Sequence, residues 1–267
     1  PHMNYAETLR AQLRRSPLVL DGGLATALES RGHDLSGSLW SAKLLFENPQ
    51  AITDVHRGYV EAGADVIATA SYQVSRSGFV AAGKSAADAD AALIRSIELA
   101  QSVAPERVHV AVSLGPYGAS LADGSEYRGD YKIGLAELKA FHRERLEVLA
   151  NSDAKLLAFE TVPALVEVEA INQLLAEEFP NFAAWISVSA RNSSELSDGT
   201  SLGEALTAAT ASNLIGFGVN CTKPEFIAEL AREAALNPSP IIAYPNAGRT
   251  WDANNRIWLD AGTPRFA

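Results

Sequence analysis

Short apolar runs recur along the chain and alternate with segments of helical periodicity. The runs cover residues 18–21, 66–71, 108–113, 155–160, 184–189, 214–221 and 240–245. Continuous apolar runs of this length are typical of parallel strands buried on both faces. The pattern therefore predicts seven parallel strands.

The segments between these runs have helix signals. Asn48 offers an N-cap, Pro49 suits the first helical position, and apolar residues then follow at helical spacing as far as Gly63. Residues 165–175 repeat the apolar spacing. Strands that alternate with helices predict an α/β fold with right-handed crossovers.

Seven strand–helix units fall one short of a closed barrel, which needs eight. Residues 246–267 contain turn-like sequences and no eighth strand. An open doubly wound sheet is the alternative, but the first strand lacks the G-x-G-x-x-G turn of dinucleotide-binding sheets. We expect a (β/α)8 TIM-type barrel, formed by residues 3–267 as a single domain, with its eighth strand missing. Residues 1–2 look like a vector scar.

Composition excludes several classes of protein. The 267 residues carry 22 Lys+Arg against 32 Asp+Glu, a net charge of -10, so a nucleic-acid partner is not expected. No apolar stretch reaches about 18 residues, so no membrane span is expected. One cysteine cannot form an internal disulfide, which fits a cytoplasmic protein. The oligomeric state stays open.

Polar residues appear abruptly where the apolar runs end. The chemistry of α/β barrels sits at the C-terminal ends of their strands, and polar groups there cost free energy unless they are paired or bound to a ligand. Such a ring of residues predicts a site for a small polar ligand. The residues are Asp21, Ser71, Tyr72, Ser113, Glu160, Thr161, Ser187, Ser189, Asn220, Cys221 and Tyr244.

Each of these residues also has a purely structural interpretation. Serine and asparagine at strand ends often cap the next helix, and Asp21 before Gly22-Gly23 could form a plain turn. A lone cysteine such as Cys221 is more often a small buried apolar side chain than a ligand. Glu160 is harder to explain structurally, because a carboxylate at the end of a buried strand needs a cation or hydrogen-bond donors.

Other barrel chemistries lack their residues. No H-x-H follows the first strand, and none of the predicted strands runs directly into a G-x-S-x-G elbow. Lys155 begins its strand, at the wrong end for a Schiff base. The histidines are scattered, and His56 and His142 are predicted to lie on the surfaces of helices.

Blocks of sequence at the strand ends carry a family resemblance. They are residues 20–26 (LDGGLAT), 38–43 (SLWSAK), 69–73 (TASYQ), 113–118 (SLGPYG), 121–131 (LADGSEYRGDY), 159–161 (FET), 196–200 (LSDGT), 218–221 (GVNC) and 244–246 (YPN). Together they resemble the homocysteine S-methyltransferase family, above all its bacterial S-methylmethionine-dependent members.

The resemblance implies a barrel that holds Zn²⁺ on three cysteine thiolates, one of them Cys221. The other two are expected as an adjacent pair in a Gly-Gly-Cys-Cys segment, which would lie beyond Ala267 because the chain has one cysteine. Zinc coordination would deprotonate the homocysteine thiol, which would then attack the methyl group of a sulfonium.

The resemblance also implies roles for the strand-end residues. Asp21 and Glu160 would hold the homocysteine amino group, and Asn220 would support the site. Trp40 is a candidate aromatic wall for the sulfonium, or else an ordinary packing residue beneath a loop. The remaining expected binding residues are Gly22, Gly23, Ser71, Tyr72 and Thr161.

The chain is therefore predicted to be a zinc-dependent homocysteine S-methyltransferase that makes methionine. S-methylmethionine is the expected donor and S-adenosylmethionine the second, with betaine and selenocysteine variants left open. The alternative is a metal-free or truncated barrel that binds thiol amino acids without catalysis. Residues 117–131 form either a cover that excludes water or a compact surface loop.

Overall fold

The centre of the molecule is a sheet of six parallel strands. The computed structural model describes residues 4–37, 39–246, 250–252 and 257–259, without the side chains of residues 40 and 41 and of the last two ranges. The strands are β1 (Val66–Ala68), β2 (His109–Leu114), β3 (Leu156–Val162), β4 (Ala183–Val188), β5 (Leu214–Asn220) and β6 (Ile241–Tyr244). Each of these strands overlaps one of the predicted apolar runs.

The strands lie in the sheet in the order in which they occur in the sequence, β1 to β6, and each pairs with the next in parallel. A doubly wound sheet would reverse its order near the middle. The uninterrupted order is that of a TIM-type barrel wall, so the α/β barrel class is confirmed and the doubly wound alternative is wrong.

The first predicted strand, residues 18–21, is reduced to a single parallel bridge between Leu20 and Val66. The amide of Asp65 donates to the Val19 carbonyl at 2.8 Å and the amide of Asp21 to the Val66 carbonyl at 2.9 Å. Among the described residues, β1 is the segment's only strand neighbour, and the pairing between them is limited to this one bridge.

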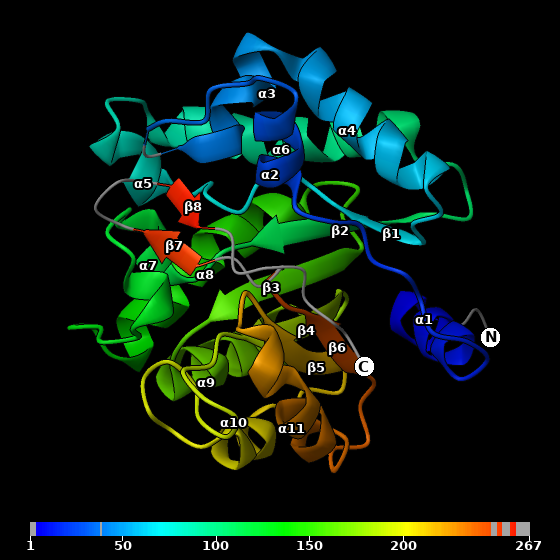
Figure 1. The fold of residues 1–267 in the computed structure, drawn as a ribbon, viewed down its shortest axis with the longest axis vertical. Coiled ribbons are helices and arrows are strands. Elements are labelled where there is room, and N and C mark those ends of the chain that lie inside the picture. Colours follow the sequence, from blue (N-terminus) through cyan, green and yellow to red (C-terminus); the bar gives the residue numbers. More distant parts are fainter. Residues whose placement is uncertain (1–3, 38, 247–249, 253–256, 260–267) are drawn as a thin grey trace.

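Helices connect the strands and cover the outer face of the sheet (Figure 1). In chain order, the helical segments are α1 (Tyr5–Leu13), α2 (Leu24–Ser30), η1 (Trp40–Lys43), α3 (Leu44–Glu47), α4 (Pro49–Glu61), α5 (Arg76–Ala81), α6 (Ala86–Val103), α7 (Tyr117–Ser120), η2 (Ser125–Tyr127), α8 (Leu135–Ala150), α9 (Leu165–Gln173), η3 (Leu174–Glu178), α10 (Leu202–Ala208) and α11 (Pro224–Ala234). None of the described helices has the length and apolarity needed to cross a bilayer.

The helix predicted after Asn48 is confirmed as α4. The Asn48 side chain accepts a hydrogen bond from the Ala51 amide at 3.2 Å, and Pro49 occupies the first turn. Gly63 follows the helix with φ of 103°, a left-handed conformation that glycine adopts without strain.

Two apolar clusters hold these layers together. The larger fills the space between the sheet and its covering helices, around Phe79, Phe159 and Ile171. The smaller lies on the inner face of the sheet, where Leu9 of α1 packs with Trp185 and other strand residues. Helix α1 stands apart from the other helices (Figure 1), and its Leu9 packs against this inner face.

A separate antiparallel pair, β7 (Thr250–Asp252) and β8 (Ile257–Leu259), follows β6. The sequence predicted no eighth barrel strand in residues 246–267, and this pair forms a separate two-stranded sheet. The pair therefore adds no strand to the parallel sheet.

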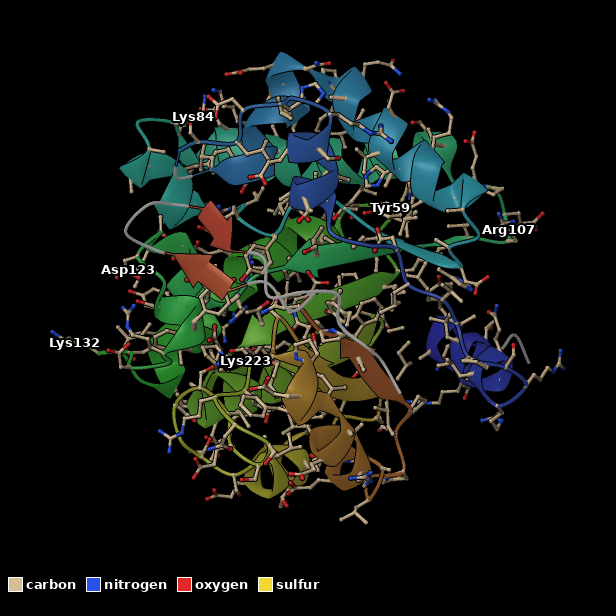
Figure 2. All side chains as sticks on the ribbon, in the orientation of Figure 1. Tyr59, Lys84, Arg107, Asp123, Lys132 and Lys223 are labelled. Atoms are coloured by element: carbon tan, nitrogen blue, oxygen red, sulfur yellow. The ribbon has the colours of Figure 1, made fainter. Side chains whose placement is uncertain are left out.

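The strand directions define one end of the molecule. Arg107 precedes β2 and lies at one end, while Asp123 and Lys132, which follow β2, lie at the opposite end (Figure 2). Because all six strands are parallel, the residues after each strand gather at the second end.

Candidate active site

A carboxylate at the end of β3 organises one side of the candidate site. Glu160 accepts hydrogen bonds from Ser113 Oγ at 2.7 Å and from the Tyr244 hydroxyl at 3.0 Å. Burial raises the pKa of Glu160, while these two hydrogen bonds lower it. The expectation that this carboxylate needs partners is confirmed.

Asp21 is the second carboxylate at this end. Its Oδ2 accepts a hydrogen bond from the Ala68 amide at 2.8 Å. Burial raises the pKa of Asp21 to about 8, the Ala68 hydrogen bond lowers it, and the charge of Glu160 raises it further. None of the ion pairs among the described residues includes Asp21 or Glu160. Two coupled acids without a cation favour a ligand that brings one.

Asn220 joins the ends of β3 and β5. Its Oδ1 accepts from the Thr161 amide at 2.8 Å, and its Nδ2 donates to Thr161 Oγ1 at 2.8 Å and to Cys221 Sγ at 3.4 Å. Thr161 and Cys221 both have positive φ, 58° and 46°. The β3–β4 register also shifts between Phe159 and Val162. Strained backbone and bulges of this kind concentrate at functional sites.

Cys221 is a free thiol immediately after β5. Burial raises its pKa to about 11; hydrogen bonds with Thr161 and Asn220 lower it, and the charges of Glu160 and Glu126 raise it. The thiol is therefore protonated at neutral pH unless a cation joins it. No group of three or more His, Cys, Asp or Glu side chains among the described residues could hold a metal.

Ser71 and Tyr72 occupy different layers of the site. Ser71 is fully buried, and its hydroxyl donates to the Ser113 carbonyl at 2.7 Å, which ties β1 to β2. The pKa of Tyr72 is raised well above its usual value by burial, with further contributions from Tyr127, Glu126 and Cys221. The charge of Cys221 thus reaches Tyr72, whereas Ser71 serves to join two strands.

The two glycines after Asp21 have packing roles. A Cβ on Gly22 would lie 2.6 Å from the Tyr59 hydroxyl oxygen, so only glycine fits under that ring. Gly23 is the N-cap of α2, and its carbonyl accepts a hydrogen bond from Tyr59 at 3.0 Å. The Trp40 backbone begins η1, and its side chain lies outside the described residues. Binding roles for these three residues stay predictions.

In the described part of the chain, neither Asn220 nor any of the strand-end serines caps an α-helix. The N-cap residues of these helices, in chain order, are Asn4, Gly23, Lys43, Asn48, Ser75, Ser85, Pro116, Gly134, Ala164, Ser201 and Lys223. The structural interpretation of these residues as caps is therefore wrong. The side chains of Ser71, Ser113, Ser187 and Asn220 instead bond to residues of other strand ends, and Ser189 bonds to Glu126 and Ser197.

Tyr244, which was predicted at a strand end, donates to Glu160 and also lies 2.7 Å from Ser187 Oγ. Sequence reasoning missed one member of the site. Glu126 acts on the pKa of both Cys221 and Tyr72 but belongs to the 117–131 connection. A position within a loop gave no comparable signal.

The expectation that His56 and His142 are surface residues is wrong. Their exposed fractions are 0% and 1%. His142 Nε2 lies 2.7 Å from Glu167 Oε1, and its Nδ1 lies 2.7 Å from an Arg145 nitrogen. Sequence reasoning assigns a polar residue on a helix to the surface, because the segments that bury it lie elsewhere in the sequence.

Comparisons with known proteins agree with this geometry. A sequence profile described as Homocysteine S-methyltransferase matches residues 18–264. The chain is 42% identical to the Homocysteine S-methyltransferase of Escherichia coli over 97% of this chain and 87% of that protein. It is 44% identical to Homocysteine S-methyltransferase YbgG of Bacillus subtilis over 91% and 82%. It is 40% identical to the Selenocysteine Se-methyltransferase of Brassica oleracea var. italica over 91% and 76%.

A solved structure gives the same result. The metallated form of the homocysteine methyltransferase MmuM from Escherichia coli superposes with a TM-score of 0.83 at 41% identity. The match covers 90% of this chain and 87% of that one.

Proposed function

The chain belongs to the homocysteine S-methyltransferase family, and from this premise we propose that it transfers a methyl group from a sulfonium donor to homocysteine, giving methionine. The observation that carries the proposal is the pair of carboxylates, Asp21 and Glu160, next to the Cys221 corner. Homocysteine has an ammonium group to satisfy the acids and a sulfur to receive the methyl group.

The carboxylates would bind the homocysteine ammonium. Ser113 and Tyr244 fix the orientation of Glu160, and the Ala68 amide fixes Asp21. Because these partners are neutral donors, the pair keeps its negative charge for the ligand when it ionises. Charge-assisted hydrogen bonds of this kind hold a substrate in one orientation and so favour attack by its sulfur.

The reaction is a displacement at carbon. The homocysteine sulfur forms a bond to the methyl carbon while the bond from that carbon to the donor sulfur breaks, and the electron pair of the broken bond neutralises the sulfonium. The acceptor thiol gives up one proton in the overall reaction. With S-methylmethionine, which we propose as the preferred donor, both products are methionine.

Zinc is the metal that we propose, with Cys221 as one ligand. The metallated form of the structural neighbour supports a metal in this family. A catalytic zinc site usually has three protein ligands, and the described residues supply only Cys221. They do not complete a zinc site by themselves, so the roles above are assigned only to the chain's own residues.

Methionine formation tests this proposal. The full chain should convert homocysteine to methionine with S-methylmethionine, and less efficiently with S-adenosylmethionine, when zinc is supplied. Glu160→Gln should lower kcat/KM for homocysteine by about 10- to 100-fold through loss of a charged hydrogen bond. Glu98→Gln, an exposed acid on α6, is the matched control and should leave turnover unchanged. No methionine with either donor would reject the proposal.

Binding without catalysis is the second candidate. The single sulfur at the site among the described residues favours it. Calorimetric binding of homocysteine to the zinc-supplied chain, without methionine formation from either donor, would select this candidate. Cys221→Ser should then leave homocysteine binding unchanged.

A further inference from the structure

Glu126 is a buried carboxylate that the strand ends do not supply. It lies in η2 with 4% of its surface exposed, and its Oε2 has no hydrogen-bond partner among the described residues. Burying a carboxylate in this way is costly without a compensating charge. Arg128, a cation in the same loop, pairs instead with Asp123 at 3.9 Å and with Asp130 at 3.3 Å.

The loop places Glu126 over the candidate site. Its carbonyl accepts a hydrogen bond from Ser189 Oγ at 3.1 Å, and Ser189 immediately follows β4. The η2 segment also contacts β3, which carries Glu160 and Thr161. The hydrogen bond from Ser189 and the contact with β3 hold Glu126 at the strand ends that carry the candidate site.

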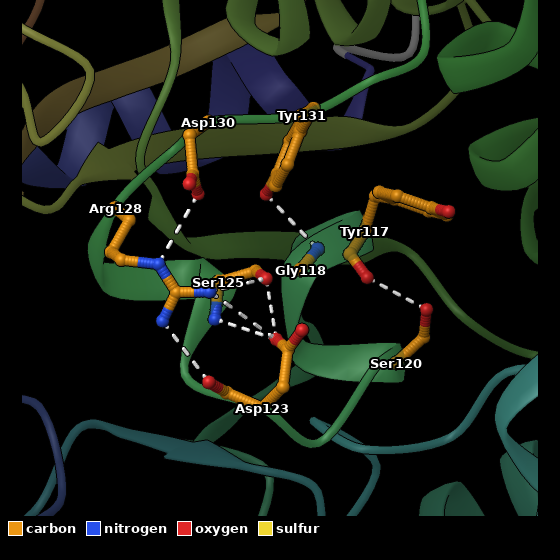
Figure 3. Close-up of polar contacts among 8 residues, drawn as sticks. All are labelled: Tyr117, Gly118, Ser120, Asp123, Ser125, Arg128, Asp130 and Tyr131. Atoms are coloured by element: carbon orange, nitrogen blue, oxygen red, sulfur yellow. Dashed lines mark hydrogen bonds and ion pairs between the residues drawn. The ribbon is translucent and has the colours of Figure 1, made fainter.

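Hydrogen bonds within the loop hold η2 in place. The Gly118 amide donates to the Tyr131 hydroxyl at 3.0 Å, and the Ser125 amide donates to the Asp123 carboxylate at 2.9 Å (Figure 3). Arg128 donates to the Asp123 carbonyl at 3.1 Å. A Cβ on Gly118 would lie 2.6 Å from the Glu126 amide nitrogen, so glycine permits this close approach. The 117–131 loop is thus a compact structure that presents Glu126 in one position.

We propose that Glu126 binds the positive charge of the methyl donor. This inference rests on the proposed function. Asp21 and Glu160 are already matched to the ammonium of the acceptor, which leaves Glu126, whose Oε2 has no partner among the described residues, as a further carboxyl group at this end of the sheet. A sulfonium amino acid carries its charge on sulfur and on nitrogen, and a carboxylate recognises either.

A kinetic separation tests this role. Glu126→Gln keeps the shape and removes the charge, so the donor KM should rise about 10- to 100-fold while the homocysteine KM stays unchanged. The kcat should stay the same or rise, because the sulfonium loses its charge during transfer and a nearby carboxylate stabilises the ground state more than the transition state. Asp130→Asn removes an exposed charge from the same loop and should change neither KM.

Donors with one charge identify the group that is bound. If Glu126 contacts the sulfonium, Glu126→Gln should weaken turnover of trimethylsulfonium, which has no ammonium. If it contacts the ammonium, the penalty should appear with S-methylmethionine only. Either result supports the inference. An unchanged donor KM for both compounds, or an equal rise in the homocysteine KM, overturns it.

Binding measurements separate this inference from the proposed function. Calorimetric titration of S-methylmethionine alone needs no turnover, and Glu126→Gln should bind it about 10- to 100-fold more weakly than the wild type. An unchanged Tm would show that the variant is folded. Failure of the wild type to form methionine rejects the function, whereas equal donor affinity in both proteins rejects the role of Glu126.

Discussion

Asp21 and Glu160, the two carboxylic acids of the site, have no cationic partner among the described residues, and this disfavours ionisation of both. The pKa of Asp21 is raised to about 8. Burial is the largest cause, the hydrogen bond from Ala68 lowers the pKa, and the charge of Glu160 raises it. At pH 7 Asp21 therefore holds a proton that an ordinary aspartate would have lost. An ammonium placed between the acids favours the ionised form, so ligand binding should expel this proton.

We predict that methionine binding releases a proton at pH 7. Methionine has the ammonium group but no thiol, so the proton comes from the protein's carboxylates. Calorimetric titrations in two buffers with different ionisation enthalpies should give different apparent binding enthalpies, corresponding to between about 0.5 and 1 proton. In Asp21→Asn the difference should fall by at least half. Identical enthalpies in both buffers would contradict this assignment.

Strand-end polarity made several site residues predictable. Glu160, Asn220 and Cys221 follow apolar runs directly, so the sequence pattern alone placed them at one end of the sheet. Glu126 could not be found in this way, because its burial depends on a close approach to Gly118 and on Ser189 from another connection. Such contacts between distant segments have no signature in local sequence.

At the level of elements, prediction was accurate where burial decides the structure. Strand β5 (Leu214–Asn220) matches the predicted run 214–221, because it is buried along its whole length. Residues 18–21 have the same apolar character, but Val19 is 58% exposed and the segment forms a single bridge. An apolar run therefore becomes a full strand here only where the sheet and its helices bury it.

The contact between β5 and β6 depends on one glycine. A Cβ on Gly218 would lie 1.7 Å from the Ile242 carbonyl oxygen, a backbone atom that cannot move unless the strands separate. A Cβ on Gly216 would meet the Ile242 side chain at 2.9 Å, which can rotate away. Tyr244 lies on the same strand as Ile242, so separation would also displace a partner of Glu160.

Gly218→Ala should therefore destabilise the protein far more than Gly216→Ala. We expect a loss of about 3 kcal/mol or more in the free energy of unfolding for Gly218→Ala, and less than about 1.5 kcal/mol for Gly216→Ala. Urea unfolding followed by circular dichroism measures both values. Equal midpoints for the two variants would show that β6 is not held against β5 in this register.

On the scale of the whole molecule, the order of the sheet was predictable and the packing of α1 against its inner face was not. Alternating strands and helices dictate sequential parallel neighbours, as observed from β1 to β6. The position of α1 depends on Leu9, which is fully buried against residues more than a hundred positions away, such as Trp185. An amphipathic helix indicates that it packs, but not against which surface.

A buried histidine also makes the stability of the whole molecule depend on pH. His56 of α4 has an exposed fraction of 0%, and neither ring nitrogen has a partner among the described residues. Burial lowers its pKa to about 4. In the unfolded chain the imidazole takes up a proton near pH 6.5. Between pH 6.5 and 4 the unfolded state binds more protons, so stability falls as the pH falls.

His56 should account for about 2 kcal/mol of the stability lost between pH 7.5 and pH 5. The pH falls about 1.5 units below the pKa of the unfolded state, and each unit costs about 1.4 kcal/mol. In His56→Leu, urea unfolding at the two pH values should show a difference smaller by that amount. Stability at pH 7.5 should be equal or higher, because two unpartnered nitrogens are removed. His33→Gln, at a partly exposed position, should keep the wild-type difference. If His56→Leu also keeps it, acid sensitivity originates in other groups, such as the buried His142, whose pKa burial also lowers.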